Sequence, residues 1–186
     1  FDYSGEVTAF IGPEIRVRKN LSRKPETIRI ADGVEYNGTY FGKLHISDEN
    51  PAFPITVKPG QKLIVDFGRE IVGRARLNIS GKRNAVLKVR YAEFLNDSGE
   101  PGRGNDGPKD SVYTINLRSA LAKSYYVFAN KETVDYMPSF TFFGFRYAEL
   151  TCDGEFTLNN ITGEVIGNDI KETGSIVTSD ENVNKL

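Results

Sequence analysis

Apolar and polar residues alternate with a period of two along much of this 186-residue chain. Ala75, Leu77 and Ile79 alternate with polar residues, and the same pattern returns in residues 87–92. Successive side chains of a β-strand point to opposite faces of its sheet, so this alternation is typical of antiparallel strands with one packed face and one wet face. The chain is therefore expected to fold mainly into sheets.

Two other segments predict more deeply buried strands. Residues 62–67 and 141–150 carry bulky apolar side chains at both odd and even positions, as central strands do. Pro59-Gly60 and the residues 81–84 supply the backbone freedom that chain reversals need. Only residues 117–123 suggest a helix, and a short one. Strands at such spacing predict an all-β fold, an antiparallel β-sandwich.

The charge balance excludes two classes of partner. The chain has 24 basic and 25 acidic side chains, whereas a nucleic-acid-binding protein carries a basic excess. Like charges form no block that would attract a membrane surface. The longest apolar runs fall far short of the roughly 18 residues that span a bilayer. We therefore expect neither nucleic acid nor membrane as a partner.

Three positions that carry chemistry in other proteins have structural explanations here. Residues 66–68 spell the Asp-Phe-Gly motif of kinases, but no His-Arg-Asp catalytic loop accompanies them. We expect a turn at a strand end, in which Asp66 bonds backbone amides and Phe67 packs inward. His45 is expected to be structural or at the surface. Cys152, the single cysteine, excludes an intramolecular disulfide and is expected to be buried at a strand end.

Paired carboxylates are considered because glycosidases use two of them. The candidates are Asp66, Glu70, Glu93, Asp97 and Asp110. A chain with 25 acidic residues contains such pairs by chance, and the spacing alone does not establish a sugar-sized cleft. We therefore assign no catalytic residue.

The polar loop from Asn96 to Asp110 offers the oxygen ligands that Ca²⁺ prefers. Its acidic spacing does not match the EF-hand loop, because no glutamate stands at the closing position. We expect a solvated loop, with a calcium site as the alternative, and we predict no metal and no cofactor.

Aromatic side chains are the best candidates for recognition. Tyr125, Tyr126, Tyr136 and Phe143 can stack on a sugar or on a neighbouring domain, and Arg146 can anchor an interface. Core packing is the competing interpretation, since aromatic residues favour strands.

Four motifs occur together in a recognisable order. They are Asp-Phe-Gly-Arg-Glu-Ile-Val-Gly at 66–73, Tyr-Ala-Glu-Phe-Leu-Asn-Asp-Ser-Gly at 91–99, Leu-Arg-Ser-Ala at 117–120 with Tyr126 after it, and the residues 138–147 around Gly-Phe-Arg-Tyr. In this order they resemble the concanavalin-like, jelly-roll β-sandwich module of bacterial α-L-rhamnosidases. The resemblance implies a non-catalytic accessory module. Family members cleave terminal α-L-rhamnose with inversion, and their acid and base carboxylates lie on a separate helical barrel.

The resemblance also implies a domain layout. Residues 1–25 form a leading segment at a preceding domain, residues 26–177 the β-sandwich, and residues 178–186 a linker toward the catalytic barrel. Within the tail, residues 173–176 resemble a last strand and residues 180–186 the start of the first barrel-side helix.

The chain starts at Phe1 without a signal-peptide pattern, and we expect a piece of a longer secreted or periplasmic enzyme. The absence of disulfides is compatible with secretion, because a large multidomain enzyme can fold without them.

Three functions remain open. The first is a scaffold for the catalytic helical barrel of the same polypeptide, which is then the main partner. The second is a carbohydrate-binding module that recognises rhamnose-containing or other plant polysaccharides. The third is a stand-alone adhesin-like β-domain.

Overall fold

The computed structural model describes residues 17–130, 132–170 and 173–185. Contacts divide the chain into a large compact unit, Lys19–Ile166, and a second unit made of residues 1–18 and 167–186. Residues 1–16 of the predicted leading segment lie outside the described part of the chain. The strands are β1 (Val17–Arg23), β2 (Thr27–Glu35), β3 (Lys43–Glu49), β4 (Ile55–Val57), β5 (Lys62–Gly81), β6 (Val86–Ala92), β7 (Phe94–Leu95), β8 (Val112–Tyr113), β9 (Lys123–Val127), β10 (Val134–Tyr136), β11 (Phe143–Cys152) and β12 (Phe156–Asn168).

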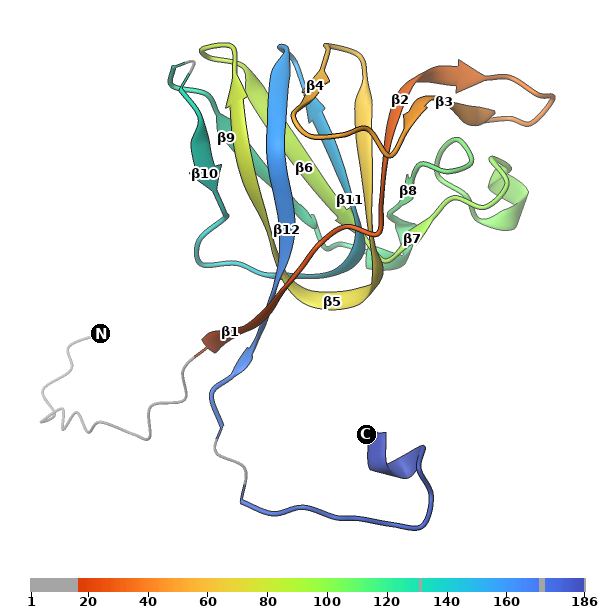
Figure 1. The fold of residues 1–186 in the computed structure, drawn as a ribbon. Coiled ribbons are helices and arrows are strands. Elements are labelled where there is room, and N and C mark those ends of the chain that lie inside the picture. The colour runs from red at the N-terminus through yellow and green to blue at the C-terminus, as the bar shows by residue number, and fades with distance from the viewer. Residues whose placement is uncertain (1–16, 131, 171–172, 186) are drawn as a thin grey trace, which may run out of the picture. The chain divides into compact units, whose positions relative to one another are not determined.

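The long strand β5 belongs to both layers of the sandwich. Its first half pairs with β2 and β11, and its second half pairs with β10 and β12. One layer therefore runs β3-β2-β5-β11-β6-β9, and the other contains β1, β12, β5 and β10, with β4 added to β12. All these pairs for which a register is given are antiparallel, and Figure 1 shows β5 curving at the lower end of the sandwich. The predicted antiparallel β-sandwich is confirmed.

Two segments that the sequence predicts as separate strands form one continuous strand in the structure. Residues 62–67 and 74–80 are both part of β5, because the chain bends at Gly68 without leaving the sheet. Gly68 has a φ of 78°, which a residue with a Cβ rarely adopts. The bend turns the second half of the strand into the opposite layer.

A single large apolar core fills the space between the layers. The alternating side chains of Ala75, Leu77 and Ile79 are fully buried, as predicted. Phe67 meets Phe145 edge to face, with ring centroids 5.6 Å apart. Burying one such side chain contributes about 1.5–3 kcal/mol, so this core supplies most of the driving force for folding.

The outer face of the first layer is partly covered. A smaller apolar cluster forms there around Ala31, Leu44 and Ile64, with Leu95 packed against it. It is covered by the hairpin of β2 and β3 and by the lobe that carries β7 and β8, which Figure 1 shows beside each other. The outer face of this layer therefore also contains a small apolar core.

Two predictions about helices and tail strands are wrong. Within residues 117–123 only the end of a 3₁₀ turn (Ile115–Leu117) is helical, because Arg118 turns to a φ of 55° and stops it. Residues 173–176 form no strand, and among the tail residues 173–185 the structure shows only the 3₁₀ turn Val183–Lys185.

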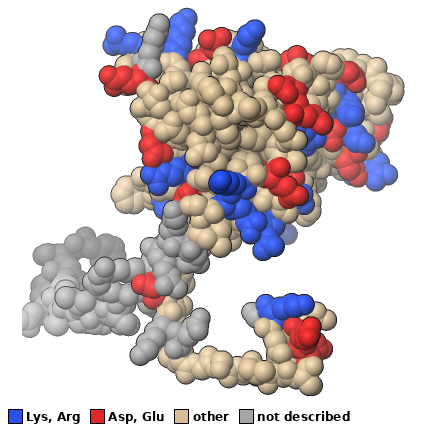
Figure 2. Space-filling view, in the orientation of Figure 1, with Lys and Arg blue, Asp and Glu red and all other residues tan. Residues whose placement is uncertain are grey.

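Acidic and basic side chains are mixed on the surface, in keeping with their nearly equal numbers in the sequence. Figure 2 shows acidic and basic side chains interspersed around one face of the sandwich, with mostly uncharged residues over its middle. Among the described residues, no helix is long and apolar enough to cross a bilayer.

Candidate functional site

The bend of β5 is held by an ion pair. Arg146 donates from Nε to Asp66 Oδ1 (2.8 Å) and from Nη2 to Asp66 Oδ2 (2.9 Å). The backbone amide of Gly68 also donates to Asp66 Oδ1, at 2.7 Å. The predicted role of Asp66 at the turn and the inward packing of Phe67 are thus confirmed.

The same contacts shift the pKa values of Asp66 and Arg146. Burial by itself raises the pKa of Asp66, but the hydrogen bonds from Arg146 and Gly68 outweigh it and lower that pKa. The pKa of Arg146 is raised, chiefly by its hydrogen bonds to Asp66. Arg146, predicted as an interface anchor, therefore has its guanidinium engaged within the module.

The three predicted tyrosines lie close together but differ in exposure. The ring of Tyr126 lies 5.1 Å from Phe128 and 4.8 Å from Tyr136, so Tyr126 belongs to the packing. The hydroxyl of Tyr136 donates to the backbone oxygen of Tyr125 at 3.2 Å. Tyr125 is about half exposed, with Lys123 Nζ 5.9 Å from its ring centroid. Of the three, Tyr125 offers the most accessible ring.

Phe143 stacks on the core. Its ring lies 4.2 Å from that of Tyr91, at an interplanar angle of 15°. Burial raises the pKa of Tyr91 to about 12, and the Tyr91 hydroxyl lies 3.4 Å from Ser124 Oγ. The ring of Phe143 is therefore mainly part of the packing and is less available to a ligand.

An exposed apolar surface, which the sequence analysis did not identify, lies beside Phe143. Leu121 is 75% exposed and Phe142 is 61% exposed. Both line a hollow of about 370 Å³, together with Leu117 and Gly144. Val72 is half exposed and pairs with Gly144. We call Val72, Leu117, Leu121 and Phe142 the end patch.

The pairing of β12 with β5 ends beside the end patch. Gly73 of β5 pairs with Phe143 on one side and with Val165 of β12 on the other. Val165, where the pairing of β12 with β5 ends, therefore lies at the end of the sandwich that carries the end patch.

The structure gathers most of the candidate carboxylates around one cleft. Glu70, Glu93, Asp97 and Asp110 line a depression of about 580 Å³. Burial, followed by the charge of Glu93, raises the pKa of Glu70. Asp66 is the exception, because it is bound by Arg146.

These carboxylates have other partners as well. Asp97 pairs with Arg103 at 3.0 Å, and Glu93 accepts a hydrogen bond from Asn116 at 2.6 Å. Glu70 itself is exposed to solvent. No pair here is shut away from water in the manner that acid–base catalysis on a sugar uses.

The loop from Asn96 to Asp110 is closed by its own hydrogen bonds. Asn96 and Asn105 are buried while residues 101–104 are exposed, so the expected solvated loop is solvated only in part. Asp106 Oδ1 accepts from Asn96, and its Oδ2 accepts from the amide and hydroxyl of Thr114. These hydrogen bonds outweigh the effect of burial and lower the pKa of Asp106. Within the described residues, no three His, Cys, Asp or Glu side chains converge to hold a metal.

His45 and Cys152 lie where the sequence suggests. His45 is half exposed and its Nδ1 lies 2.6 Å from Asp32 Oδ1, which raises the pKa of His45. Cys152 is buried at the end of β11, and burial raises the pKa of its thiol. The charged partners of His45 are the carboxylates of Asp32 and Glu35, neither of which is a hydroxyl or thiol nucleophile that His45 could activate.

Known proteins match this chain in both sequence and fold. The family model of the bacterial alpha-L-rhamnosidase concanavalin-like domain matches residues 56–167. The alpha-L-rhamnosidase of Streptomyces avermitilis is 35% identical over 147 residues, which cover 78% of this chain and 13% of that protein. One from Formosa agariphila is 36% identical over 126 residues, or 66% of this chain and 12% of that protein.

Solved structures of α-L-rhamnosidases have a fold similar to that of this chain. The crystal structure of the Streptomyces avermitilis enzyme complexed with L-rhamnose superposes with a TM-score of 0.55 at 25% identity, over 91% of this chain and 13% of that one. The Aspergillus terreus enzyme, at 22% identity, shares the fold with a TM-score of 0.53, over 92% of this chain and 16% of that one. The chain thus spans about an eighth of the length of these curated relatives. It belongs to the family of bacterial alpha-L-rhamnosidase concanavalin-like domains.

Proposed function

We propose that this chain is a non-catalytic module of an α-L-rhamnosidase that hydrolyses terminal α-L-rhamnose from glycans, and that it scaffolds the catalytic helical barrel of the same polypeptide. The observation that carries the proposal is the end patch, which lies beside Val165, where the pairing of β12 with β5 ends. Large apolar side chains gathered at one exposed place are typical of surfaces that another domain covers.

The position of the patch indicates the partner. The pairing of β12 with β5 ends at Val165, at the end of the sandwich that carries Leu121 and Phe142. In the curated relatives, most of the length lies outside the region that this chain matches. A domain of the same polypeptide is therefore available to cover the patch without a separate binding event.

The carboxylates support a non-catalytic role. Asp66 serves the bend of β5, and Asp97 pairs with Arg103. Glu70, whose pKa is raised, remains exposed to solvent. The chemistry of the proposed enzyme is then carried by the barrel.

The test uses the full-length polypeptide. Leu121→Ser with Phe142→Ser removes two apolar contacts, each worth about 1.5–3 kcal/mol if fully covered. We expect the barrel to unfold at a lower temperature and to release less rhamnose from a model rhamnoside. Tyr36→Ser is the matched control, since it removes an exposed ring outside the end patch.

Unchanged barrel stability and activity in the double variant contradict the scaffold role. A barrel produced without this module that keeps full stability and activity contradicts it as well.

Carbohydrate binding is the second candidate, because Tyr125 exposes its ring beside Lys123 on the outer face of the first layer. A glycan array probed with the 186-residue chain distinguishes the two functions. Binding to rhamnose-containing glycans supports this role, and a silent array removes it.

A further inference from the structure

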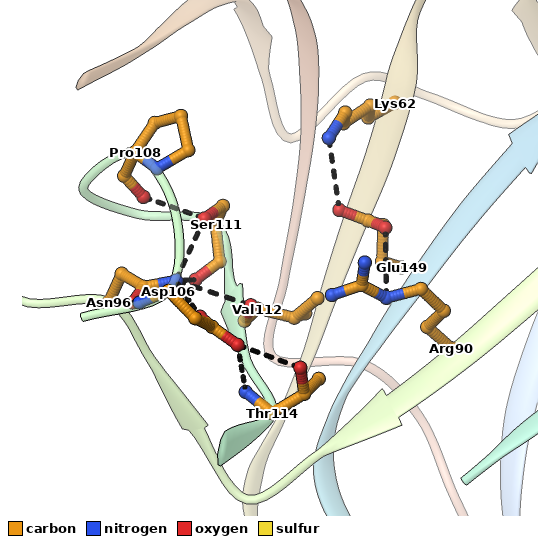
Figure 3. A network of polar contacts seen from close by, with 9 residues as sticks. All are labelled: Lys62, Arg90, Asn96, Asp106, Pro108, Ser111, Val112, Thr114 and Glu149. Carbon is orange, nitrogen blue, oxygen red and sulfur yellow. Dashed lines mark hydrogen bonds and ion pairs between the residues drawn. The ribbon is translucent and has the colours of Figure 1, made fainter. Parts of the chain in front are cut away.

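Glu149 is a buried carboxylate under the loops that cover the first layer. It lies on β11 between Ile64 of β5 and Arg90 of β6, and its side chain is only 2% exposed. Lys62, two residues before Ile64, points from the same face of the sheet. Figure 3 shows Glu149 between Lys62 and Arg90, facing the loop that carries Asp106.

The contacts of Glu149 are loose. Its Oε1 lies 3.5 Å from Arg90 Nε, and its Oε2 lies 3.6 Å from Lys62 Nζ. Oε2 accepts no hydrogen bond from any described residue. A buried carboxylate oxygen without a hydrogen bond is costly, because it has lost its water and gained only a distant counter-ion. The carboxylate of Glu149 can therefore accept a further donor.

A cavity lies in front of this carboxylate. Its volume is about 220 Å³, and Lys62, Arg90 and Glu149 line it together with residues of the covering loop. A single water needs roughly 30 Å³, so the space exceeds one bridging water, and it is smaller than the roughly 300 Å³ of a drug-sized pocket. One small ring fits these limits.

The loop side of the cavity is already satisfied. Asp106 Oδ2 is occupied by the amide and hydroxyl of Thr114, and Ser111 donates its hydroxyl hydrogen to Pro108 O. The free hydrogen-bonding capacity therefore belongs to Glu149, Lys62 and Arg90. Lys62 is 39% exposed and Arg90 31% exposed, so the cavity is open to solvent beside them.

We propose that this cavity binds one neutral pyranose ring through two neighbouring hydroxyl groups. A hydroxyl both donates and accepts, which suits a site where Glu149 only accepts and Lys62 and Arg90 only donate. One hydroxyl donates to Glu149 Oε2, and its neighbour accepts from the cationic side chains. An anion would meet the carboxylates of Glu149 and Asp106, and a metal ion would meet two cations.

The proposal refines the carbohydrate-binding candidate and does not depend on the scaffold role. It assigns the sugar to the Glu149 cavity, whereas an exposed ring such as Tyr125 offers only stacking. The cavity and Tyr125 can therefore be tested separately.

The experiment is saturation-transfer NMR with the 186-residue chain. The probes are L-rhamnose and D-galactose, both neutral, and the anion D-galacturonate. We expect transfer to a neutral sugar, and a weakening by about tenfold in Glu149→Gln, which keeps the shape but loses the charge-assisted hydrogen bond. Lys62→Met should weaken binding as well. Lys58→Met, at an exposed lysine outside the cavity, is the matched control and should bind as the parent does.

Three results overturn the proposal. No transfer to either neutral sugar means that the cavity holds only water. Preferential binding of D-galacturonate means that the site recognises a charge. Binding that survives Glu149→Gln but is lost in Tyr125→Ala keeps the carbohydrate-binding function and removes the Glu149 cavity as its location.

Discussion

Asp66 and Glu149 are two carboxylates on the same face of one sheet, and their surroundings differ. Tyr147 pairs with Asp66, and Glu149 pairs with Ile64 two positions along β5, so the two acids lie on neighbouring rungs. Asp66 accepts two hydrogen bonds from Arg146 and one from Gly68, all within 2.9 Å. Glu149 has its two cations at 3.5 and 3.6 Å. Asp66 is a closed structural contact, while Glu149 leaves room for a further partner.

The largest effect is expected at Asp66. Asp66→Asn removes the charge that Arg146 and Gly68 share, and we expect a loss of about 2–3 kcal/mol in the free energy of unfolding. Urea denaturation followed by circular dichroism measures it. If Asp66→Asn lowered the free energy of unfolding by less than the loss of an exposed ion pair does, Asp66 would not hold the bend.

The pH dependence sharpens this result. The folded-state pKa of Asp66 is lowered, so its contribution to stability is fully present above the ordinary value of 3.8 and disappears as the pH falls through the lowered value. The difference in unfolding free energy between the parent and Asp66→Asn should therefore be constant near neutral pH and shrink in acid. A difference that grows in acid contradicts the assignment.

Glu149→Gln should cost less, because Lys62 and Arg90 reach solvent and can be hydrated when the carboxylate is gone. We expect a loss below about 1 kcal/mol, unlike the strong penalty of leaving a fully buried charge unpaired. Thermal unfolding of the parent and the variant gives the comparison. A loss equal to that of Asp66→Asn would make both acids structural contacts.

The smallest loss of stability is expected for an ion pair that has a similar geometry but is exposed to solvent. Arg76 and Asp135 form a bidentate ion pair across β5 and β10, with both side chains 46% exposed. Asp135→Asn should leave the urea midpoint unchanged within error, because solvent screens exposed pairs. A clear shift would mean that burial does not explain the strength of the Asp66 contact.

Much of the sandwich was predictable from neighbouring residues. The alternation at Ala75, Leu77 and Ile79 identified which side chains are buried, and Asp66-Phe67-Gly68 predicted the turn chemistry. These features are local, since the two-residue period and a glycine with positive φ depend on only a few positions.

Other features could not be predicted from the sequence, because they depend on residues far apart in the chain. Residues 62–67 and 74–80 looked like two strands, and only pairing with β11 and β12 shows that β5 joins the layers. Leu121 and Phe142 look like ordinary core residues in a strand-rich sequence, yet both are exposed. Glu149 was one acid among 25, and its burial follows from a loop nearly forty residues earlier.

The order of apolar and polar residues was enough to predict a layered sheet protein, and four motifs in a recognisable order carried the resemblance to its family. The partners of each polar side chain depended on the fold, because β5, β6 and β11 bring Lys62, Arg90 and Glu149 to one place from distant parts of the chain. Hydrogen bonds act over about 3 Å, so whether a carboxylate is satisfied or left open is decided by tertiary packing.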